Sequence, residues 1–513
     1  MHIPSTSSVL LLLVSLTLSS IAPATEAAAA PGPSADFLKC LKPLGSSKVL
    51  TAKDTAYQQQ RYGFDLRYTY QPSVIIMAKS VGDVQTAVKC AAAAKIAVAP
   101  RSGGHSFEGY SLGGQDGSMV LDLTALNSVK VKGNKATVGS GIRLGKLYLD
   151  LFNQGGWTIN AGTCPSVGIG GHALGGGFGL LSRKYGLLAD RIVEIEMVDA
   201  KGKVVKASAS SNPDLFYSLR GAGGGSFGVV TSFTILPFKA ATKATSFSYE
   251  WKIKDYAAVL KAYTNYQSKA TRDIGVEMNV GPSGLELYGI FQGSKADQAK
   301  ALAPFLSAVP KPTSNDVRQG RQIDAQLRFA FVEGGKEGDI NGLSLKSPFR
   351  TGDSHYTKGK SIVYPSALKD STIALLGKWG AKKPSGATSN YIIVDLWGGA
   401  VQDTAVDATS FIHRNAHTVF EFVVEWDQSA KPKPGKADCK DCLKWMNDMY
   451  AEFLADFKSA GYAGPLRGYQ NYIDAEIPNW QDAYYGSAMT RLKKTKAAID
   501  PTNIFRFPQS IPL

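Results

Sequence analysis

Short apolar runs alternate with amphipathic stretches in the first part of the chain. Residues 73–78 and 96–100 are apolar runs that predict buried strands, and the Ala-rich stretch 81–95 between them predicts an amphipathic helix. A shorter helix is predicted over 36–42. The order strand, helix, strand predicts a small α/β unit whose last strand runs directly into a glycine turn.

Similar patterns continue as far as residue 236. They predict strands at 119–123 and 229–236, hairpins at 128–138 and 192–207, and helical segments at 144–153 and 214–220. Residues 162–179 contain so many glycines that we expect no regular element there. Such a loop costs conformational entropy on folding, and it is used where backbone must approach another group closely.

The second half of the chain mixes the two periodicities. Strands are predicted at 246–251, 391–397 and 418–426, and helices at 256–268 and 441–459. We therefore expect an α+β fold with a second domain made of an antiparallel sheet backed by helices. A change in composition to Lys, Ala and Thr between residues 237 and 245 marks the predicted domain boundary.

Composition supports a folded, secreted protein. A chain of 513 residues exceeds what one core usually serves, and 44% apolar with 19% charged residues is typical of globular proteins. The apolar run 9–18, followed by small residues, predicts a signal peptide over 1–27 and secretion. No other apolar run is long enough to span a membrane, so we expect no membrane partner. The net charge of +15 comes without a nucleic-acid-binding motif, so we expect no nucleic-acid role.

Five cysteines require an explanation in a secreted chain. Cys40 and Cys90 could pair as a disulfide in an oxidising compartment. Cys439 and Cys442 form a CxxC that is either a disulfide or a pair of thiols, and it lacks the second ligand pair of a zinc site, so we expect no metal. Cys164 is then the cysteine left over.

Two motifs about sixty residues apart carry the chemistry. Arg101-Ser-Gly-Gly-His105 and Gly162-Thr-Cys-Pro-Ser-Val-Gly168 each set one nucleophilic side chain among glycines that admit a flat, phosphate-bearing ligand. The glycine runs at 168–173 and 223–228 spell dinucleotide fingerprints, but neither has the strand before it and helix after it that a Rossmann site needs. His172, between these glycines, is expected to satisfy loop backbone.

The two motifs resemble the double flavin attachment of the berberine bridge enzyme-like oxidases, a family that includes the glucooligosaccharide oxidases. Residues 467–505 resemble the same family's C-terminal signature. The resemblance implies FAD bonded covalently through His105, to the 8α-methyl carbon, and through Cys164, to ring carbon C6. In this family a disulfide often joins the N-terminal segment, as Cys40 and Cys90 would do here.

The resemblance also implies a fold of the vanillyl-alcohol oxidase type. Its FAD-binding domain of two subdomains would span 28–240, a substrate-binding domain 241–465, and a return to the FAD domain 466–513. The residues expected to contact FAD are His105, Cys164, Arg101, Ser102, Gly103, Gly104, Thr163, Val167, Gly168, Gly170, Gly171, Val229 and Asn471.

Catalysis would fall to two residues outside these motifs. In glucooligosaccharide oxidases a Tyr in an Asn-Tyr pair is the base, and an Asp before Gly-Gly lowers its pKa; the matching residues are Tyr472 and Asp395. A phenol titrates near pH ~10, so a Tyr base requires such help. Tyr70 and Trp397 are the expected substrate-binding residues. The alternatives are that Tyr472 is a buried aromatic against the flavin, that Asp395 is a strand-end carboxylate, and that the aromatics belong to the core.

These features predict a secreted FAD-dependent oxidase that acts on a small-molecule or oligosaccharide substrate with O2, and we expect it to be a monomer. The expected reaction converts the anomeric hydroxyl of an oligosaccharide to a lactone, with O2 reduced to H2O2. Val167, three residues after Cys164, favours oxygen as the acceptor in such enzymes. One alternative is an oxidase of aromatic alcohols or alkaloid-like small molecules. The other is a non-enzymatic carbohydrate-binding flavoprotein.

Overall fold

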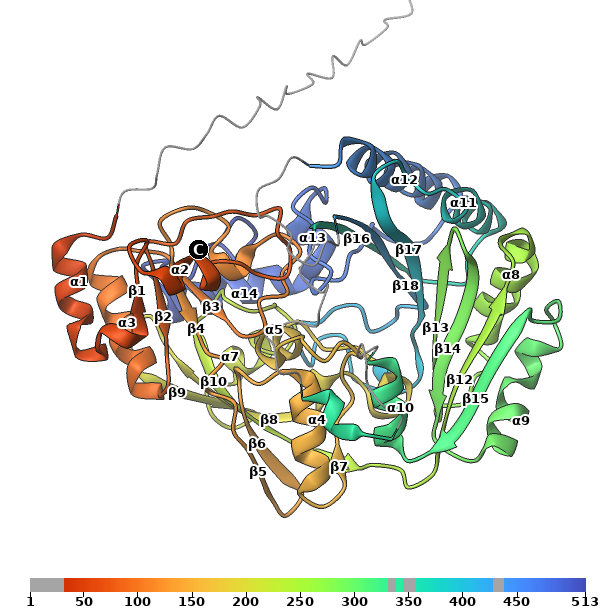
Figure 1. The fold of residues 1–513 in the computed structure, drawn as a ribbon, viewed down its shortest axis with the longest axis horizontal. Coiled ribbons are helices and arrows are strands. Elements are labelled where there is room, and N and C mark those ends of the chain that lie inside the picture. Colours follow the sequence, from red (N-terminus) through yellow and green to blue (C-terminus); the bar gives the residue numbers. More distant parts are fainter. Residues whose placement is uncertain (1–31, 331–337, 345–355, 428–437) are drawn as a thin grey trace, which may run out of the picture.

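The computed structural model describes residues 32–330, 338–344, 356–427 and 438–513, so the predicted leader 1–27 lies outside the described residues. Two lobes make up the molecule: small sheets and helices on one side, and one large sheet with its helices on the other (Figure 1). Among the described residues, no helix is both long and apolar enough to cross a membrane.

The first sheet is the predicted α/β unit. Its strands run in the order β1 (Val49–Leu50), β2 (Val74–Met77), β4 (Met119–Asp122) and β3 (Val98–Arg101). Strands β2, β4 and β3 are parallel, and helices α1 (Ala35–Leu41) and α3 (Val81–Ala93) share their apolar core. The expected disulfide between Cys40 and Cys90 is present and joins these two helices.

The second sheet is antiparallel and lies beside the first. Its strands run in the order β5 (Val129–Lys132), β6 (Lys135–Gly139), β10 (Val229–Ile235), β8 (Ile192–Val198) and β9 (Val204–Ser208). Helices α4 (Leu144–Asn153) and α7 (Pro213–Ser218) contribute apolar side chains to its core. Both predicted hairpins are confirmed, because β5 pairs with β6 and β8 pairs with β9.

The third sheet has seven strands, all antiparallel to their neighbours. The order is β15 (Ser314–Gly320), β12 (Ala244–Trp251), β14 (Gly284–Phe291), β13 (Ile274–Gly281), β17 (Ala387–Leu396), β18 (Thr418–Trp426) and β16 (Tyr356–Tyr364). Its outer face packs against α8 (Tyr256–Tyr266), α9 (Lys295–Leu306), α11 (Asp370–Gly380) and α12 (Lys440–Ser459) (Figure 1). The antiparallel sheet backed by helices is therefore confirmed, and its other face turns toward the first lobe.

The last part of the chain returns to the first lobe, as the family resemblance implies. Helices α13 (Trp480–Tyr485) and α14 (Met489–Ile499) pack into the core of the second sheet. Ile504 and Phe505 then enter the core of the first sheet, and the carbonyl of Ile504 accepts a hydrogen bond from the backbone N–H of Val98, at the start of β3, at 2.8 Å. The C-terminal segment thus completes structure that begins near the N-terminus.

One prediction of local structure is wrong. The stretch 162–179 contains a short helix, α5 (Ile169–Leu174), where we expected no regular element. A Cβ added at Gly170 would lie 2.8 Å from the carbonyl oxygen of Ser140 and 2.9 Å from Cβ of Ser102. The glycines therefore allow the helix to pack closely against its neighbours, and they do not prevent it from forming.

Candidate active site

Ser166 brings the two motif side chains together. Its hydroxyl lies 2.9 Å from Nε2 of His105 and 3.2 Å from Sγ of Cys164. The ring of His105 also stacks on Phe64, with the ring centroids 4.4 Å apart. Both disulfides in the described residues, Cys40–Cys90 and the CxxC bond between Cys439 and Cys442, leave Cys164 out. The two side chains expected to bond FAD are therefore neighbours in space.

Direct contact of two backbones explains the glycines of these motifs. A Cβ added at Gly103 would lie 2.2 Å from the backbone nitrogen of Gly168, and one added at Gly168 would lie 2.1 Å from that of Gly103. Any side chain at either position would separate the motifs. Ser102 adds to this contact, because its hydroxyl donates to the carbonyl of Ser140 (2.7 Å) and accepts from the N–H of Gly170 (3.2 Å).

Three glycines from the two glycine runs present open backbone. A Cβ at Gly171 would have no neighbour within 4 Å, one at Gly223 would meet only the Tyr485 hydroxyl at 3.8 Å, and one at Gly224 would lie 3.8 Å from Gly171 Cα. Bare backbone of this kind can approach a phosphate-bearing ligand closely. Together with an adjacent imidazole and thiol, the arrangement fits FAD.

Other residues expected to contact FAD have side chains engaged within the protein. Arg101 is buried and donates to Asp122 at 2.7 Å, while Val229 is fully buried at the start of β10. Val167 packs against the core of the second sheet. Thr163 lines a small cavity together with Tyr148. Gly104 has a positive φ of 76°, which suits a glycine in the turn before His105. Contact of these residues with FAD stays a prediction.

Asn471 and His172 join the Tyr472 segment to the Cys164 motif. The Asn471 amide donates to the carbonyl of His172 at 3.1 Å and to the Tyr469 hydroxyl at 2.8 Å. The His172 ring accepts from the backbone N–H of Gly162 at 3.1 Å, which confirms its expected backbone-satisfying role. Burial lowers the pKa of His172 to about 4, so the ring is neutral and able to accept this hydrogen bond.

Tyr472 faces Asp395 across the two lobes. The Tyr472 hydroxyl donates to Oδ2 of Asp395, at the end of β17, over 3.5 Å. Burial and the carboxylates of Glu421 and Asp395 raise the pKa of Tyr472 well above its ordinary value. This corrects the expectation that Asp395 lowers it, because a buried anion beside a phenol disfavours the phenolate. Tyr472 is therefore protonated, with Asp395 as its acceptor.

Three buried carboxylates on adjacent strands form what we call the carboxylate face: Glu277 on β13, Asp395 on β17 and Glu421 on β18. Glu277 and Asp395 are direct cross-strand partners, and the Tyr288 hydroxyl donates to Glu277. Burial raises the pKa of Glu277 to about 7, and burial together with Glu277 raises that of Glu421 to about 8. For Asp395, burial, Glu277 and Glu421 raise the pKa well above its ordinary value.

Tyr391 connects the carboxylate face to the thiol. It lies on β17, and its hydroxyl is 3.5 Å from Oε1 of Glu425. Burial, Glu425, Glu421 and Cys164 together raise the pKa of Tyr391 well above its ordinary value. Tyr391 therefore lies within electrostatic range of both Glu421, on the carboxylate face, and Cys164, in the motif that is expected to bond the flavin.

The two expected substrate residues differ in their surroundings. Trp397 is fully buried and stacks on Phe178 at 4.6 Å and on Phe411 at 5.7 Å. A sugar platform requires an exposed ring face, so the structure gives Trp397 a packing role instead. Tyr70 is half-buried and stacks on Tyr68 at 5.6 Å, and its contact with substrate stays a prediction.

Sequence reasoning did not single out several charged residues that surround the site, namely Glu108, Glu277, Lys358, Glu421 and Asp474. A signal was present, since Glu277, Lys358 and Glu421 each interrupt a stretch of strand-forming residues. A charged side chain inside a buried strand is costly unless it is paired or functional.

The comparisons with known proteins agree with this geometry. The chain matches the FAD binding domain family over residues 72–208 and the "Berberine and berberine like" family over 468–512. It is 30% identical to a chitooligosaccharide oxidase of Gibberella zeae, across 89% of this chain and 90% of the relative.

Two solved structures are similar over 93% of this chain and 99% of their own chains. One is BBE-like 1 from Physcomitrella patens, with 34% identity and a TM-score of 0.84. The other is a glucooligosaccharide oxidase from Acremonium strictum, with 25% identity and a TM-score of 0.81, which carries 6-S-cysteinyl, 8α-N1-histidyl FAD.

Proposed function

The chain belongs to the berberine bridge enzyme-like family of FAD-linked oxidoreductases, and we propose that it is a secreted oxidase of oligosaccharides. In the proposed reaction the anomeric hydroxyl becomes a lactone carbonyl. The sugar loses two electrons and two protons, and O2 gains them as H2O2. Secretion is supported by the predicted leader and by two disulfides, which persist in oxidising compartments.

We propose that His105 and Cys164 hold FAD covalently. Their shared contact with Ser166 and the open glycine backbone nearby support this assignment. The His105→Ala/Cys164→Ala double variant should lose all flavin that resists denaturation, while each single variant should keep part of it. Flavin fluorescence of the protein band on a denaturing gel measures this. Yellow protein after acid precipitation of the double variant would refute the assignment.

Proton removal in the proposed reaction falls to Tyr472 and Asp395. When FAD is bound, it supplies the acceptor for the hydride from the sugar carbon. Tyr472 takes the proton of the substrate hydroxyl as its own hydroxyl proton passes to Asp395, over the existing hydrogen bond. Asp395 accepts this proton in its ionised form, and its raised pKa makes that carboxylate a stronger base. Tyr472 therefore does not need to be deprotonated before the substrate binds.

The Tyr472 hydroxyl facing Asp395 is the single observation that carries this function, and removing it is the direct test. Tyr472→Phe should bind FAD normally and yet be reduced by substrate about 10²–10⁴-fold more slowly, the usual contribution of general acid–base catalysis. Tyr266→Phe is the matched control, since that buried hydroxyl donates to the Ala301 carbonyl on the outer side of the large sheet. An unchanged anaerobic reduction rate in Tyr472→Phe would exclude it as the base.

The substrate class is tested by peroxide release from the purified protein. Cello-, malto-, xylo- and chito-oligomers are compared with aromatic alcohols, with anaerobic bleaching of the flavin recorded alongside. Peroxide with one of the oligosaccharides is the expected result. Bleaching by aromatic alcohols alone would exclude the proposed oligosaccharide substrate and favour an oxidase of aromatic alcohols or alkaloid-like small molecules. Bleaching without peroxide would make the protein a dehydrogenase, and no bleaching by any donor would favour a carbohydrate-binding flavoprotein.

A further inference from the structure

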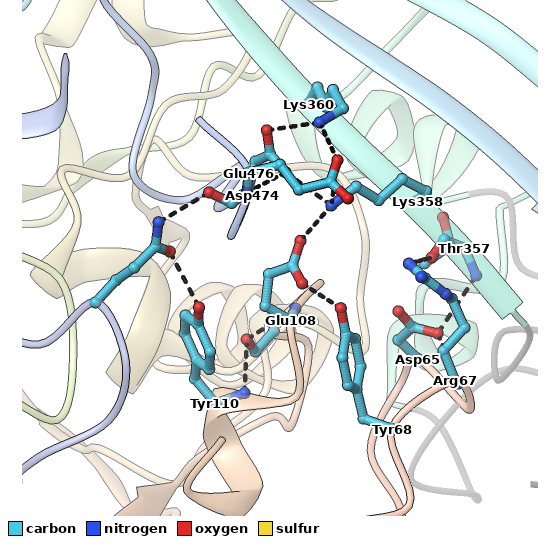
Figure 2. Close-up of polar contacts among 12 residues, drawn as sticks. Asp65, Arg67, Tyr68, Glu108, Tyr110, Thr357, Lys358, Lys360, Asp474 and Glu476 are labelled. Atoms are coloured by element: carbon cyan, nitrogen blue, oxygen red, sulfur yellow. Dashed lines mark hydrogen bonds and ion pairs between the residues drawn. The ribbon is translucent and has the colours of Figure 1, made fainter. Parts of the chain in front are cut away.

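Five charged side chains meet at the edge strand β16 (Figure 2). We call them the ionic cluster: Glu108, Lys358, Lys360, Asp474 and Glu476. The Lys358 ammonium lies 2.7 Å from both Glu108 and Asp474, while Lys360 lies 3.0 Å from Asp474 and 2.6 Å from Glu476. All but Glu476 are buried.

The ionic cluster joins three segments that are distant in the sequence. Glu108 follows His105 by three residues, and Asp474 follows Tyr472 by two. Lys358 stands between these carboxylates and comes from β16 of the large sheet. The Lys358 ammonium group thus bridges the segment of the residue expected to bond the flavin and the segment of the proposed base. Figure 2 shows Glu108 and Asp474 converging on Lys358 from separate chain segments.

Glu108 and Asp474 each have further hydrogen bonds besides those to Lys358. Glu108 accepts a hydrogen bond from the Tyr68 hydroxyl. The backbone N–H of Asp474 donates to the Tyr484 hydroxyl at 2.9 Å, and the carbonyl of Asp474 accepts from the Gln509 amide at 2.9 Å. The same Gln509 amide accepts from the Tyr110 hydroxyl at 3.2 Å, so Gln509 joins the backbone of Asp474 to the His105 loop. The Lys358 ammonium is the charged bridge between the two segments, and it is the one that reaches both carboxylates.

The opposite charges in the ionic cluster favour the ionised forms of Lys358 and Asp474. Burial disfavours the Lys358 ammonium, but Glu108 and Asp474 outweigh burial, so the pKa of Lys358 lies above its ordinary value. Lys358 and Lys360 likewise outweigh burial at Asp474, whose pKa lies below its ordinary value. Charge-assisted hydrogen bonds between such groups are short and dependent on geometry. Apolar side chains could fill the same space, but they would not fix the positions of Glu108 and Asp474 so closely.

We propose that Lys358 is a positioning residue, which keeps the His105 loop and the Tyr472 segment in register across the two lobes. The proposal rests on the function proposed above, because it assumes that both segments serve one reaction. Displacement by about 1 Å can reduce a rate by about 10²-fold, so a small change in this connection should affect the chemistry.

The test compares Lys358→Met with the double variant Glu108→Gln/Lys358→Met. The double variant removes one cation and one anion together, so the balance of charge in the ionic cluster is unchanged and folding is favoured. Asp456→Asn is the control for general destabilisation, since Asp456 is buried on α12 and accepts from the Thr372 hydroxyl away from the site. Three quantities are measured: anaerobic flavin reduction at saturating substrate, the covalently attached flavin fraction, and hydrogen exchange at 104–110 and 470–476.

The double variant should melt near the wild-type temperature and still be reduced about 10- to 100-fold more slowly, with faster exchange in both segments. KM should change less than kcat, because the substrate contacts remain. Asp456→Asn should melt earlier and keep its rate. A wild-type rate and wild-type exchange in the double variant would overturn the proposal. So would an equal loss of rate in Asp456→Asn.

The two proposals fail in different ways. If no donor reduces the wild-type protein, the proposed function fails. Hydrogen exchange and the attached flavin fraction in the double variant then still decide the role of Lys358. If the wild-type protein is reduced normally and the double variant matches it, only the positioning role is lost.

Discussion

Two buried groups of carboxylates, the carboxylate face and the ionic cluster, differ in the partners that surround them. Asp395 and Asp474 are equally inaccessible, at 1% and 0% exposed. Burial with Glu277 and Glu421 raises the pKa of Asp395, whereas Lys358 and Lys360 hold the pKa of Asp474 below its ordinary value despite burial. Burial alone therefore does not set the charge of a buried acid.

This difference assigns separate roles to the two regions. In the ionic cluster, neighbouring opposite charges raise the pKa of Lys358 and lower that of Asp474 despite burial, so both favour their charged forms and suit a scaffold. On the carboxylate face, Glu277 and Glu421 have pKa values raised to about 7 and about 8, and that of Asp395 is raised in the same direction, so these acids can take up protons, as a proton acceptor in catalysis requires. The Tyr472 segment meets both regions, through Tyr472 at the carboxylate face and through Asp474 in the ionic cluster.

The largest expected effect comes from the carboxylate face. Asp395→Asn should reduce the rate of anaerobic flavin reduction about 10²–10⁴-fold, because Tyr472 loses the acceptor of its proton. Its stability at pH 7 should be equal to wild type or higher, since a buried acid without a cation is costly to ionise. Stopped-flow absorbance and thermal unfolding measure the two quantities. A normal rate, or a large loss of stability, would contradict the assignment of a catalytic role to the carboxylate face and a structural role to the ionic cluster.

Removing a carboxylate from the ionic cluster should instead lower stability. Asp474→Asn leaves Lys358 and Lys360 buried with fewer counter-charges, and breaking such an interaction typically costs about 3–5 kcal/mol of unfolding free energy. Urea denaturation followed by tryptophan fluorescence measures this loss. Asp456→Asn, whose carboxylate accepts from a neutral hydroxyl, should lose less. Equal losses of unfolding free energy in the two variants would mean that Lys358 and Lys360 do not make Asp474 more important for stability than Asp456.

The pH dependence of stability should separate the two regions further. The unfolded chain releases the Glu421 proton near the ordinary value of 4.5, whereas the folded protein holds it up to about 8. The folded state binds more protons between these values, so this contribution to stability is complete below the lower value and is lost as pH rises through the upper one. Glu421→Gln should flatten the decline in melting temperature between pH 5.5 and pH 8.5. An identical decline in variant and wild type would contradict the raised pKa.

The smallest effect is expected at the solvent end of the ionic cluster. The Glu476 side chain is 53% exposed where it meets Lys360, and exposed ion pairs contribute about 0–1 kcal/mol. Glu476→Gln should therefore leave the unfolding free energy within about 1 kcal/mol of wild type, by the same urea titration. A loss of unfolding free energy as large as that of Asp474→Asn would show that solvent exposure does not decide how much each ion pair contributes to stability.

Local pattern predicted much of the fold, because periodicity depends on neighbouring residues. The α/β unit, both hairpins and strands β12, β17 and β18 lie close to their expected bounds. Strands β13 to β16 were not predicted. In the sequence of β16, Lys358 and Lys360 flank Gly359 and have Thr357 and Ser361 as their other neighbours, a pattern that does not by itself indicate a buried strand.

The site was predictable only where one short motif carries the chemistry. His105, Cys164 and Tyr472 each lie in such a motif. Lys358 lies 250 residues from Glu108 and 116 from Asp474, so their contact depends on the tertiary arrangement. The raised pKa of Tyr472 was missed for the same reason, since Glu421 joins Asp395 beside it only when β17 and β18 pair.

The return of the chain end to the first lobe has a consequence for biosynthesis. Tyr472, Asp474 and the Ile504 carbonyl that pairs with Val98 are all translated after both motifs and after every strand of the large sheet. A nascent chain that already displays the His105 and Cys164 motifs still lacks the segment that joins them to the large sheet. Complete assembly of the site must therefore follow translation, and any product that stops before residue 472 cannot form it.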